Sequence, residues 1–303
     1  MIFAVKWQYF HVWALNLLIF HNIIELYSLN PDEIRYYINE LTRVRQMRVI
    51  SFCAEGIKKA TKAGFFEWAL QQDADIIAIQ DLQAQEYDLH DNVYFPSEYN
   101  AYFFDAVEKN SNGVAIYTRK LPKAIMTGLA MGDMDMEGRY VQADFDNISV
   151  GSLLAPFASD DDDAGISKKN QFYRYFLPHL EKISKKRRNY IFCGNFNVAH
   201  ADIDVQHPSK HENTTPGFLN HERDWFDEIL GGGEYLDAFR EMNFDPDQFT
   251  FWPTDATRLN DGWRIDYQIV SADLRDKISR VEIVTEPVFS QHAPVIIDYD
   301  LEL

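Results

Sequence analysis

Cysteine and positive charge are both scarce in this sequence. Cys53 and Cys193, the two cysteines of the chain, both lie inside apolar runs, which excludes a disulfide framework and is typical of a reducing cytoplasm. Lysine and arginine number 29 against 47 aspartates and glutamates, so that the net charge is -18. Such a chain repels nucleic acid as a whole, and contact with a phosphate backbone would need a local basic patch or a bridging partner.

A long uninterrupted apolar run is also missing. The first 46 residues are rich in tryptophan, phenylalanine, isoleucine and leucine, but His11, Asn16 and His21 interrupt them. This leaves less than the roughly 20 apolar residues that a membrane span needs, and no small-residue cleavage site follows. A strand-like run begins directly after Met47. We therefore expect residues 1–46 to be an extension outside the fold or an artefact of an upstream start, and residues 47–303 to form one domain without a membrane anchor.

From Met47 onward, strand-like apolar runs alternate with amphipathic segments. Helices are expected at 56–71, 170–186 and 222–230, and strands at 49–53, 75–80, 101–104, 113–117, 139–145, 148–154, 190–196, 249–252, 264–271, 281–285 and 295–299. The strands at 139–145 and 148–154 are separated by a short turn and should be antiparallel. Parallel-looking and antiparallel pairs with helices between them predict an α/β fold, with two mixed β-sheets packed face to face and helices outside.

Polar side chains stand where the expected strands end. The set comprises Cys53, Glu55, Asp81, Asn195, Asn197, Asp266, Gln291 and His292. If the strand ends converge, the pattern predicts a metal-assisted phosphodiesterase, in which a divalent ion, a base and a histidine support an in-line displacement. The alternative is that these are ordinary polar residues at strand ends, and their spacing alone leaves both interpretations open.

A basic run closes the helix expected at 170–186. It consists of Lys185, Lys186, Arg187 and Arg188. Cations at a helix C-terminus interact favourably with the helix dipole, so the run is either a solvated helix end or a contact for RNA or a partner protein.

Two further features carry weaker expectations. The aspartates at 160–163 lack the alternating ligand spacing of a calcium loop, and we expect a surface loop there. Phe251 and Trp252 are expected to pack in an aromatic core, with a loop facing nucleic acid as the alternative.

Seven short stretches carry a more specific pattern. They are Gly-Asn-Phe-Asn-Val-Ala-His at 194–200, Ile-Asp-Val at 203–205, Pro-Gly-Phe-Leu at 216–219, Glu-Arg-Asp-Trp-Phe at 222–226, Leu-Asp-Ala-Phe-Arg at 236–240, Gly-Trp-Arg-Ile-Asp-Tyr at 262–267 and His-Ala-Pro at 292–294. In this order they resemble the exonuclease III and apurinic endonuclease family, over the chain from Met47 to the C-terminus. The resemblance implies the four-layer α/β sandwich of the endonuclease, exonuclease and phosphatase superfamily.

At the positions where that family carries its chemistry, the sequence departs from the family's pattern. By the resemblance, Cys53 takes the place of an asparagine that helps to hold the metal, and Asp81 that of a metal-binding glutamate. Leu154 stands in place of an active-site tyrosine, and Asn195 in place of the aspartate that orients or deprotonates the attacking water. Gln291 replaces a further aspartate. The resemblance therefore implies a weakened metal site.

Three positions keep the family's residue types. They are Asn197, Asp266 and His292, and the last two could still pair. Mg²⁺ prefers anionic oxygen ligands, of which Asp81 is the best that remains, with Glu55 as a substitute. Because the loss of one preorganised catalytic group costs about 10²–10³ in rate, the several departures predict a non-enzymatic member with a degenerate site, no metal and no cofactor.

With retained scaffold residues and an altered metal rim, the sequence resembles the catabolite repression control group of the family. That resemblance implies a cytoplasmic post-transcriptional regulator that binds little RNA alone. It would join the RNA chaperone Hfq on A-rich mRNA sites and repress translation of catabolic genes. The alternative is a Mg²⁺-dependent exonuclease III-like DNA nuclease or apurinic endonuclease, in which Glu55 substitutes for the lost ligands. A phosphatase acting on another phosphoester is a weaker third option.

Overall fold

The computed structural model describes residues 46–159, 161–253 and 258–303. The predicted extension at 1–46 lies outside the described residues, except for Gln46. In the described part of the chain, no helix combines the length and the apolar character that crossing a membrane requires.

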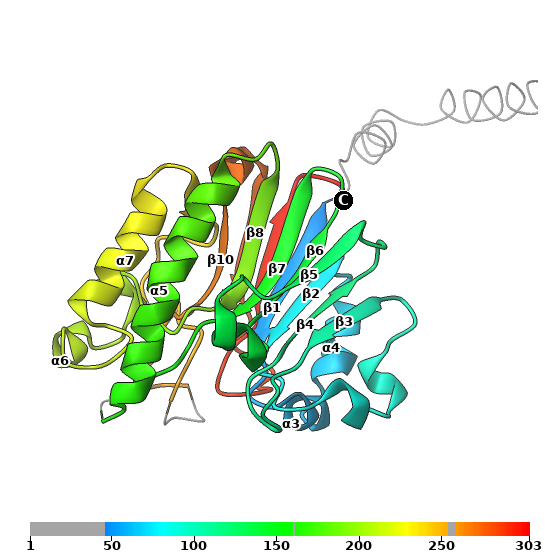
Figure 1. The fold of residues 1–303 in the computed structure, drawn as a ribbon, viewed down its shortest axis with the longest axis horizontal. Helices are drawn as coiled ribbons and strands as arrows, with labels where there is room; N and C mark the ends of the chain where they lie inside the picture. The colour runs from blue at the N-terminus through cyan, green and yellow to red at the C-terminus, as the bar shows by residue number, and fades with distance from the viewer. Residues whose placement is uncertain (1–45, 160, 254–257) are drawn as a thin grey trace, which may run out of the picture. The chain divides into compact units, whose positions relative to one another are not determined.

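The described part is built on two six-stranded mixed β-sheets (Figure 1). Their strands are β1 Met47–Cys53, β2 Ile76–Gln80, β3 Asn100–Phe104, β4 Val114–Thr118, β5 Ala124–Thr127, β6 Tyr140–Asp144, β7 Ile148–Leu154, β8 Asn189–Asn195, β9 Tyr235–Asp237, β10 Asp266–Ser271, β11 Ile278–Ile283 and β12 Val295–Tyr299. One sheet has the strand order β11-β12-β1-β2-β4-β3, and the other β5-β6-β7-β8-β10-β9. The predicted pair of mixed sheets is confirmed.

Helices cover the outer faces of the sheets. They are α3 Ile57–Lys62, α4 Phe65–Gln71, α5 Asp163–Ser184 and α7 Asn220–Gly231, whereas the short α6 Pro208–His211 buries no residue. Short 3₁₀ turns lie between them: η1 Glu86–Asp88, η2 Asn92–Tyr94, η3 Gly132–Glu137, η4 Asp202–Asp204 and η5 Ala272–Lys277. Figure 1 shows α5 and α7 beside β8 and β10, and α3 and α4 at the other side of the molecule. The chain therefore has the predicted four layers.

Three apolar clusters hold these layers together. The first lies between the sheets and includes Val49 of β1 and Ile191 of β8. The second packs α3 and α4 against the β1 sheet, through residues such as Phe65. The third packs α5 and α7 against the β8 sheet and includes Phe176 and Trp225. Because α3, α4, α5 and α7 each bury apolar residues on a sheet, the sheets are covered on both sides.

The strand registers bring several polar strand ends to one edge. The parallel pair β1 and β2 places Cys53 next to Gln80, and the parallel pair β7 and β8 places Leu154 next to Asn195. The antiparallel pair β8 and β10 sets Asn195 opposite Asp266. The convergence on which the phosphodiesterase interpretation depended is therefore present.

Gly194 allows β8 to approach β7 closely, just before this edge. A Cβ atom at Gly194 would lie 2.2 Å from the backbone oxygen of Leu153. Such a contact is far inside the van der Waals distance and involves backbone that cannot rotate away. Only glycine fits at position 194 without moving the two strands apart. The close approach of the strands sets the position of Asn195 at the edge.

Two predicted helices have different bounds in the structure. The helix expected at 56–71 is divided into α3 and α4 at Gly64, whose φ of 90° does not continue a helix. The helix expected at 170–186 begins earlier, at Asp163, because the Asp162 side chain accepts a hydrogen bond from the backbone of Gly165 and caps it. The surface loop expected at 160–163 is therefore wrong for Asp163, which is the first residue of the helix, whereas Asp162 precedes it as the N-cap.

One predicted strand is wrong, and two observed strands were missed. Residues 249–252 form no named strand, and Phe251 makes only isolated bridges to Trp263 and His292. β5 and β9 were not predicted. β5 is short and largely exposed, so its sequence lacks the apolar alternation that marks a half-buried strand.

Candidate functional site

The centre of the site is a hydrogen bond between His292 and Asp266. His292 Nδ1 lies 2.8 Å from Asp266 Oδ2, and both side chains are buried. The pair that the sequence allowed therefore forms. Burial by itself would lower the pKa of His292, but the charge of Asp266 outweighs burial and raises the pKa well above its ordinary value. The ring is consequently a cation at neutral pH and can donate a hydrogen bond.

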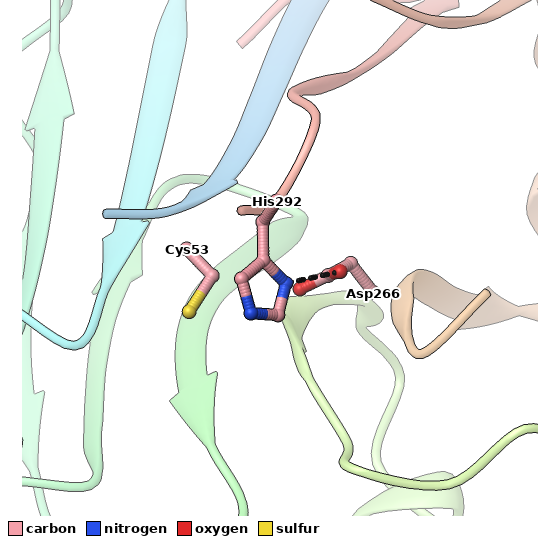
Figure 2. Close-up of side chains that lie close together, drawn as sticks. All are labelled: Cys53, Asp266 and His292. Carbon is pink, nitrogen blue, oxygen red and sulfur yellow. Dashed lines mark hydrogen bonds and ion pairs between the residues drawn. The ribbon is translucent and has the colours of Figure 1, made fainter. Parts of the chain in front are cut away.

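Cys53 ends β1 beside this pair (Figure 2). One ligand atom from each of Cys53, His292 and Asp266 lies within 4.8 Å of the others. Asn195 Nδ2 also donates to Cys53 Sγ, at 3.6 Å. Burial raises the pKa of the Cys53 thiol, against a smaller opposing effect of His292. The thiol is therefore protonated at neutral pH unless a cation binds it.

Asn195 and Asn197 form a fixed turn at the end of β8. Asn195 Oδ1 accepts a hydrogen bond from the Asn197 backbone at 2.8 Å, and Asn197 Nδ2 donates to Ala155 O at 2.8 Å. The buried Lys169 donates to the Asn197 carbonyl. Because an amide cannot take up a proton, Asn195 orients its neighbours but does not act as a base.

Asp81 and Glu55 supply carboxylates at the rim of the site. Asp81 Oδ2 accepts a hydrogen bond from Gln83 Nε2 at 2.8 Å, and Glu55 Oε2 accepts one from the backbone of Gln291 at 2.8 Å. Burial raises the pKa of Asp81, and the charge of Glu55 adds to this, while Gln83 and His292 oppose it. A cation bound at Asp81 would offset these effects, because burial and the charge of Glu55 both disfavour the ionised carboxylate of Asp81.

This donor set can be compared with the needs of Mg²⁺. Proteins commonly hold Mg²⁺ through one or two carboxylates and leave its other positions to water and substrate phosphate. Asp81 and Glu55 supply two such carboxylates at this rim. Cys53 does not meet it, because a thiolate is a soft ligand. The residues therefore fit Mg²⁺ at the two carboxylates.

Leu154 and Gln291 bring no polar group to the centre. Leu154 is buried in the cluster between the sheets. The Gln291 side chain is exposed and donates to the Pro253 carbonyl at 3.1 Å. The other predicted site residues, from Cys53 to His292, lie around the strand-end edge.

An apolar pocket of about 320 Å³ adjoins the site. Asn197, Phe251, Trp263 and Ile265 line part of it. The Phe251 ring stacks on His292, with ring centroids 4.4 Å apart. Sequence reasoning missed this pocket, because its walls come from segments far apart in the chain, and the aromatic residues at 251 and 252 were the only signal of it.

Phe251 and Trp252 differ in their surroundings. Trp252 is buried in a small cluster with Phe249 and Ala293, which confirms the expected aromatic core. Phe251 is half-buried on the pocket wall. It also packs against a second apolar cluster that includes Phe218 and Trp263. The alternative of a loop facing nucleic acid stays a prediction.

The basic run lies away from these residues. Lys185 is the C-cap of α5, and Lys186, Arg187 and Arg188 line a cavity of about 520 Å³. They precede β8, whereas Asn195 stands at its other end. Seven residues of strand at about 3.3 Å each separate the two ends. The structure thus does not bring the basic run to the strand-end site.

Comparison with known proteins places this geometry in a family. Residues 51–292 match the model of the endonuclease/exonuclease/phosphatase family. The chain is 30% identical over 255 residues to a Bacillus subtilis exodeoxyribonuclease, covering 82% of this chain and 98% of that protein. It is 29% identical over 266 residues to a Dictyostelium discoideum DNA-(apurinic or apyrimidinic site) endonuclease, covering 84% of this chain and 71% of that protein.

A solved structure supports the fold. The AP endonuclease of Archaeoglobus fulgidus superposes with a TM-score of 0.76 and 22% sequence identity, covering 84% of this chain and all of that one.

These matches contradict one prediction from the sequence. The prediction that the protein is not an enzyme is wrong, because the relatives it matches are named as nucleases. The inference overrated single substitutions, since the structure still holds the Asp266 and His292 pair and two rim carboxylates. The finer likeness to the catabolite repression control group rests on the sequence pattern alone. The chain belongs to the endonuclease/exonuclease/phosphatase family, and within it to the exonuclease III and apurinic endonuclease group.

Proposed function

We propose that the protein is a Mg²⁺-dependent DNA nuclease of the exonuclease III and apurinic endonuclease type. The observation that carries the proposal is the buried hydrogen bond of 2.8 Å between Asp266 and His292 at the edge where the strand ends meet. The names of the relatives, an exodeoxyribonuclease and an endonuclease for abasic sites, support DNA as the substrate.

The residues divide the work of phosphodiester hydrolysis between them. Mg²⁺ bound by Asp81 and Glu55 would supply positive charge for the phosphate. The His292 cation donates a hydrogen bond to a phosphate oxygen, and Asp266 keeps the ring charged and oriented. Asn195 has no group that accepts a proton, so a rim carboxylate or solvent takes the proton of the attacking water.

The apolar pocket supports cleavage at abasic sites. Enzymes that act on a damaged nucleotide turn it out of the helix into a pocket. The wall formed by Phe251, Trp263 and Ile265 gives the pocket an apolar side that suits a sugar that has lost its base. Polar residues, among them Asn197 and His211, line other parts of the pocket. Phe251 also contacts His292, which places the pocket next to the proposed phosphate contact.

Strand cleavage and its dependence on Asp81 test the proposal. The pure protein is incubated with Mg²⁺ and either a duplex containing one abasic site or a duplex with a recessed 3′ end. We expect cleavage that chelation of the metal abolishes and that Asp81→Ala slows by about 10²–10³. Asp224→Ala, which removes an exposed carboxylate on α7, should leave the rate unchanged. Absence of cleavage of both duplexes by the wild-type protein would refute the proposal.

A second function is independent of cleavage: the protein joins Hfq on A-rich mRNA, as its likeness to the catabolite repression control group implies. The supporting observation is the cavity whose lining includes Lys186, Arg187 and Arg188, which outnumber its acidic residues Glu234 and Asp273, on a chain with net charge -18. A local basic patch of this kind allows contact with RNA phosphates that the rest of the chain repels.

A gel-shift experiment tests this second function. We expect the protein to retard a complex of Hfq and A-rich RNA further, while RNA without Hfq is not retarded. Lys186→Glu combined with Arg187→Glu should abolish the additional shift. Lys58→Glu combined with Lys59→Glu, at exposed positions of α3, should not. Failure of the wild-type protein to alter the Hfq complex would count against this function.

A further inference from the structure

We propose that Lys169 forms a Schiff base with the aldehyde of an abasic sugar, a reversible covalent contact with DNA that needs no metal. Lys169 lies in α5 and lines the apolar pocket of about 320 Å³ beside the site. The proposal rests on the proposed function, because that function places the abasic sugar in this pocket. The proposed hydrolysis by itself gives Lys169 no role.

The surroundings of Lys169 are unusual for a lysine. Its side chain is 3% exposed, and other parts of the pocket wall come from Phe251, Trp263 and Ile265. Lysines are almost never fully buried unless they are paired, and a buried ion pair often costs as much free energy as it returns. Stability is therefore not a sufficient reason for a lysine here, whereas lysines that form Schiff bases are activated by apolar pockets.

Two acceptors hold the ammonium group of Lys169 at the pocket. Nζ lies 2.5 Å from Glu222 Oε1 and donates to the Asn197 carbonyl at 2.8 Å. Asn197 lines the same pocket. An ammonium group has three N–H bonds, and the described residues supply these two acceptors. One direction at Nζ is therefore left for a group inside the pocket.

Glu222 is placed to exchange a proton with Lys169. Its side chain is 1% exposed, and Oε2 accepts hydrogen bonds from the backbone of Gly217 at 2.5 Å and of Leu219 at 3.0 Å. These bonds fix the carboxylate, so that Oε1 stays next to Lys169 Nζ. Burial lowers the pKa of Lys169 against the charge of Glu222. Transfer of the proton to Oε1 leaves a neutral amine and a neutral acid, and a buried environment favours uncharged groups.

The proposed reaction is balanced without a further reactant. After Nζ has passed one proton to Glu222, its lone pair attacks C1′ of the ring-opened sugar, and a C–N bond forms as the carbonyl π bond opens. The carbonyl oxygen leaves as water with the two hydrogens of the amine. Glu222 then returns its proton to the imine nitrogen, and the product is an iminium ion that joins Lys169 to C1′.

The Schiff base would make the pocket selective for an aldehyde. Water reverses the reaction and frees the sugar, so the adduct prolongs binding without consuming the DNA. A tetrahydrofuran analogue of the abasic site has a similar ring but no aldehyde. In EDTA, we therefore expect a duplex with a natural abasic site to dissociate more slowly than the analogue duplex, and Lys169→Arg to remove this difference.

Reductive trapping tests for the covalent contact. The full-length protein is incubated in EDTA with a duplex that contains one abasic site, and sodium cyanoborohydride is added to reduce the C=N bond to a stable amine. We expect a protein–DNA adduct on a denaturing gel, and mass spectrometry of its peptides should locate the sugar on Lys169. The tetrahydrofuran duplex should give no adduct.

Lys169→Arg separates the chemistry from the ion pair. Arginine keeps a positive charge beside Glu222, but its guanidinium does not lose a proton and cannot form the imine. We expect the adduct to be lost. Lys168→Arg is the matched control, because this neighbouring lysine pairs with Glu137 at 2.8 Å and its side chain is 44% exposed. It should give as much adduct as the wild type.

Circular dichroism and thermal melting show whether each variant is folded. If Lys169→Arg does not fold, the peptide map of the wild-type adduct decides, because it needs no variant. No adduct in the wild type, an adduct on another lysine, or an equal adduct in folded Lys169→Arg would overturn the proposal. Mg²⁺-dependent cleavage without an adduct would refute the Schiff base alone, whereas an adduct without cleavage would support the Schiff base and refute the nuclease.

Discussion

Asp204→Ala is expected to destabilise the folded protein by about 3–5 kcal/mol, because it breaks a buried ion-pair network. Asp204 and Arg264 are each 1% exposed. Asp204 accepts hydrogen bonds from Arg264 Nε at 2.8 Å and Nη2 at 3.0 Å, and from Arg240 Nη2 at 2.8 Å. Chemical unfolding of the wild type and the variant measures the difference in the free energy of unfolding.

The size of this effect follows from what remains after the substitution. Arg264 would keep its contact with Asp237, at 2.7 Å, but two of its donors would be left buried without an acceptor. A buried guanidinium cannot lose its proton to escape this cost. Arg264 also stands two residues before Asp266, and its backbone donates to Asp204 O at 2.8 Å. The network therefore supports the start of β10, where the site begins.

Asp202→Ala provides a matched control in the same 3₁₀ turn. Asp202 pairs with Arg223 at 2.9 Å, but its side chain is 71% exposed. Exposed ion pairs contribute at most about 1 kcal/mol, so this variant should remain close to the wild type. Equal stability losses in the two variants would contradict the assignment of the effect to the buried network.

The effect of Asp204 should also depend on pH. Burial by itself would raise the pKa of Asp204, but Arg264 and Arg240 outweigh it, and the pKa lies below its ordinary value of 3.8. A carboxyl with a lowered pKa stabilises the folded state fully above its unfolded pKa, and this contribution is lost as the pH falls through the folded pKa. The difference between wild type and Asp204→Ala should therefore be constant near neutral pH and shrink below pH 3.8.

Most of the strands could be predicted from the sequence, because buried strands coincide with local apolar runs. β8 is an example: the run from Tyr190 ends at the polar Asn195, and the strand ends there. The convergence of strand ends was also foreseeable, since parallel strands followed by helices present their carboxyl ends at one edge. Two features could not be predicted from the periodicity of apolar residues. β5 is largely exposed and so lacks an apolar pattern, and the helix break at Gly64 depends on its backbone conformation.

The candidate site was less accessible to sequence reasoning. The departures at Cys53 and Asn195 were visible as residue types, but their meaning depends on neighbours in space. The structure shows Cys53 beside His292 and Asp266, and Glu55 close enough to Asp81 to affect its pKa. Single positions could not show either relationship, and the prediction of a non-enzyme followed from counting the departures together without their neighbours in space.

His292→Gln is expected to reduce the rate of the proposed DNA cleavage by about 10²–10³, the cost of removing one preorganised donor at the developing charge. His292 lies against Phe251 on one face and is held by Asp266, so its position is fixed before substrate binds. Because a donor of this kind acts more strongly in the transition state, we expect the loss in kcat and little change in KM. Single-turnover cleavage of the abasic duplex measures the loss in the rate of the chemical step.

His200→Gln is a matched control for the chemistry of the substitution. His200 forms a hydrogen bond of similar length with Asp227, at 2.7 Å, but Asp227 is 70% exposed and the pair lies outside the site. Its loss should leave kcat unchanged. Equal rates for wild type and His292→Gln would show that the pair of Asp266 and His292 is only structural.

The pH profile separates catalysis by His292 from a structural role. Since Asp266 raises the pKa of His292 against the effect of burial, the ring keeps its proton through neutral pH, and the stabilisation that it gives the fold is lost only as the pH rises through the raised pKa. The wild-type rate should therefore not fall as the pH passes 6.5, the ordinary value, and should fall at a clearly higher pH. That alkaline fall should be absent in His292→Gln, because glutamine has no proton to lose. If instead the two proteins lose activity at the same alkaline pH, another group governs the reaction.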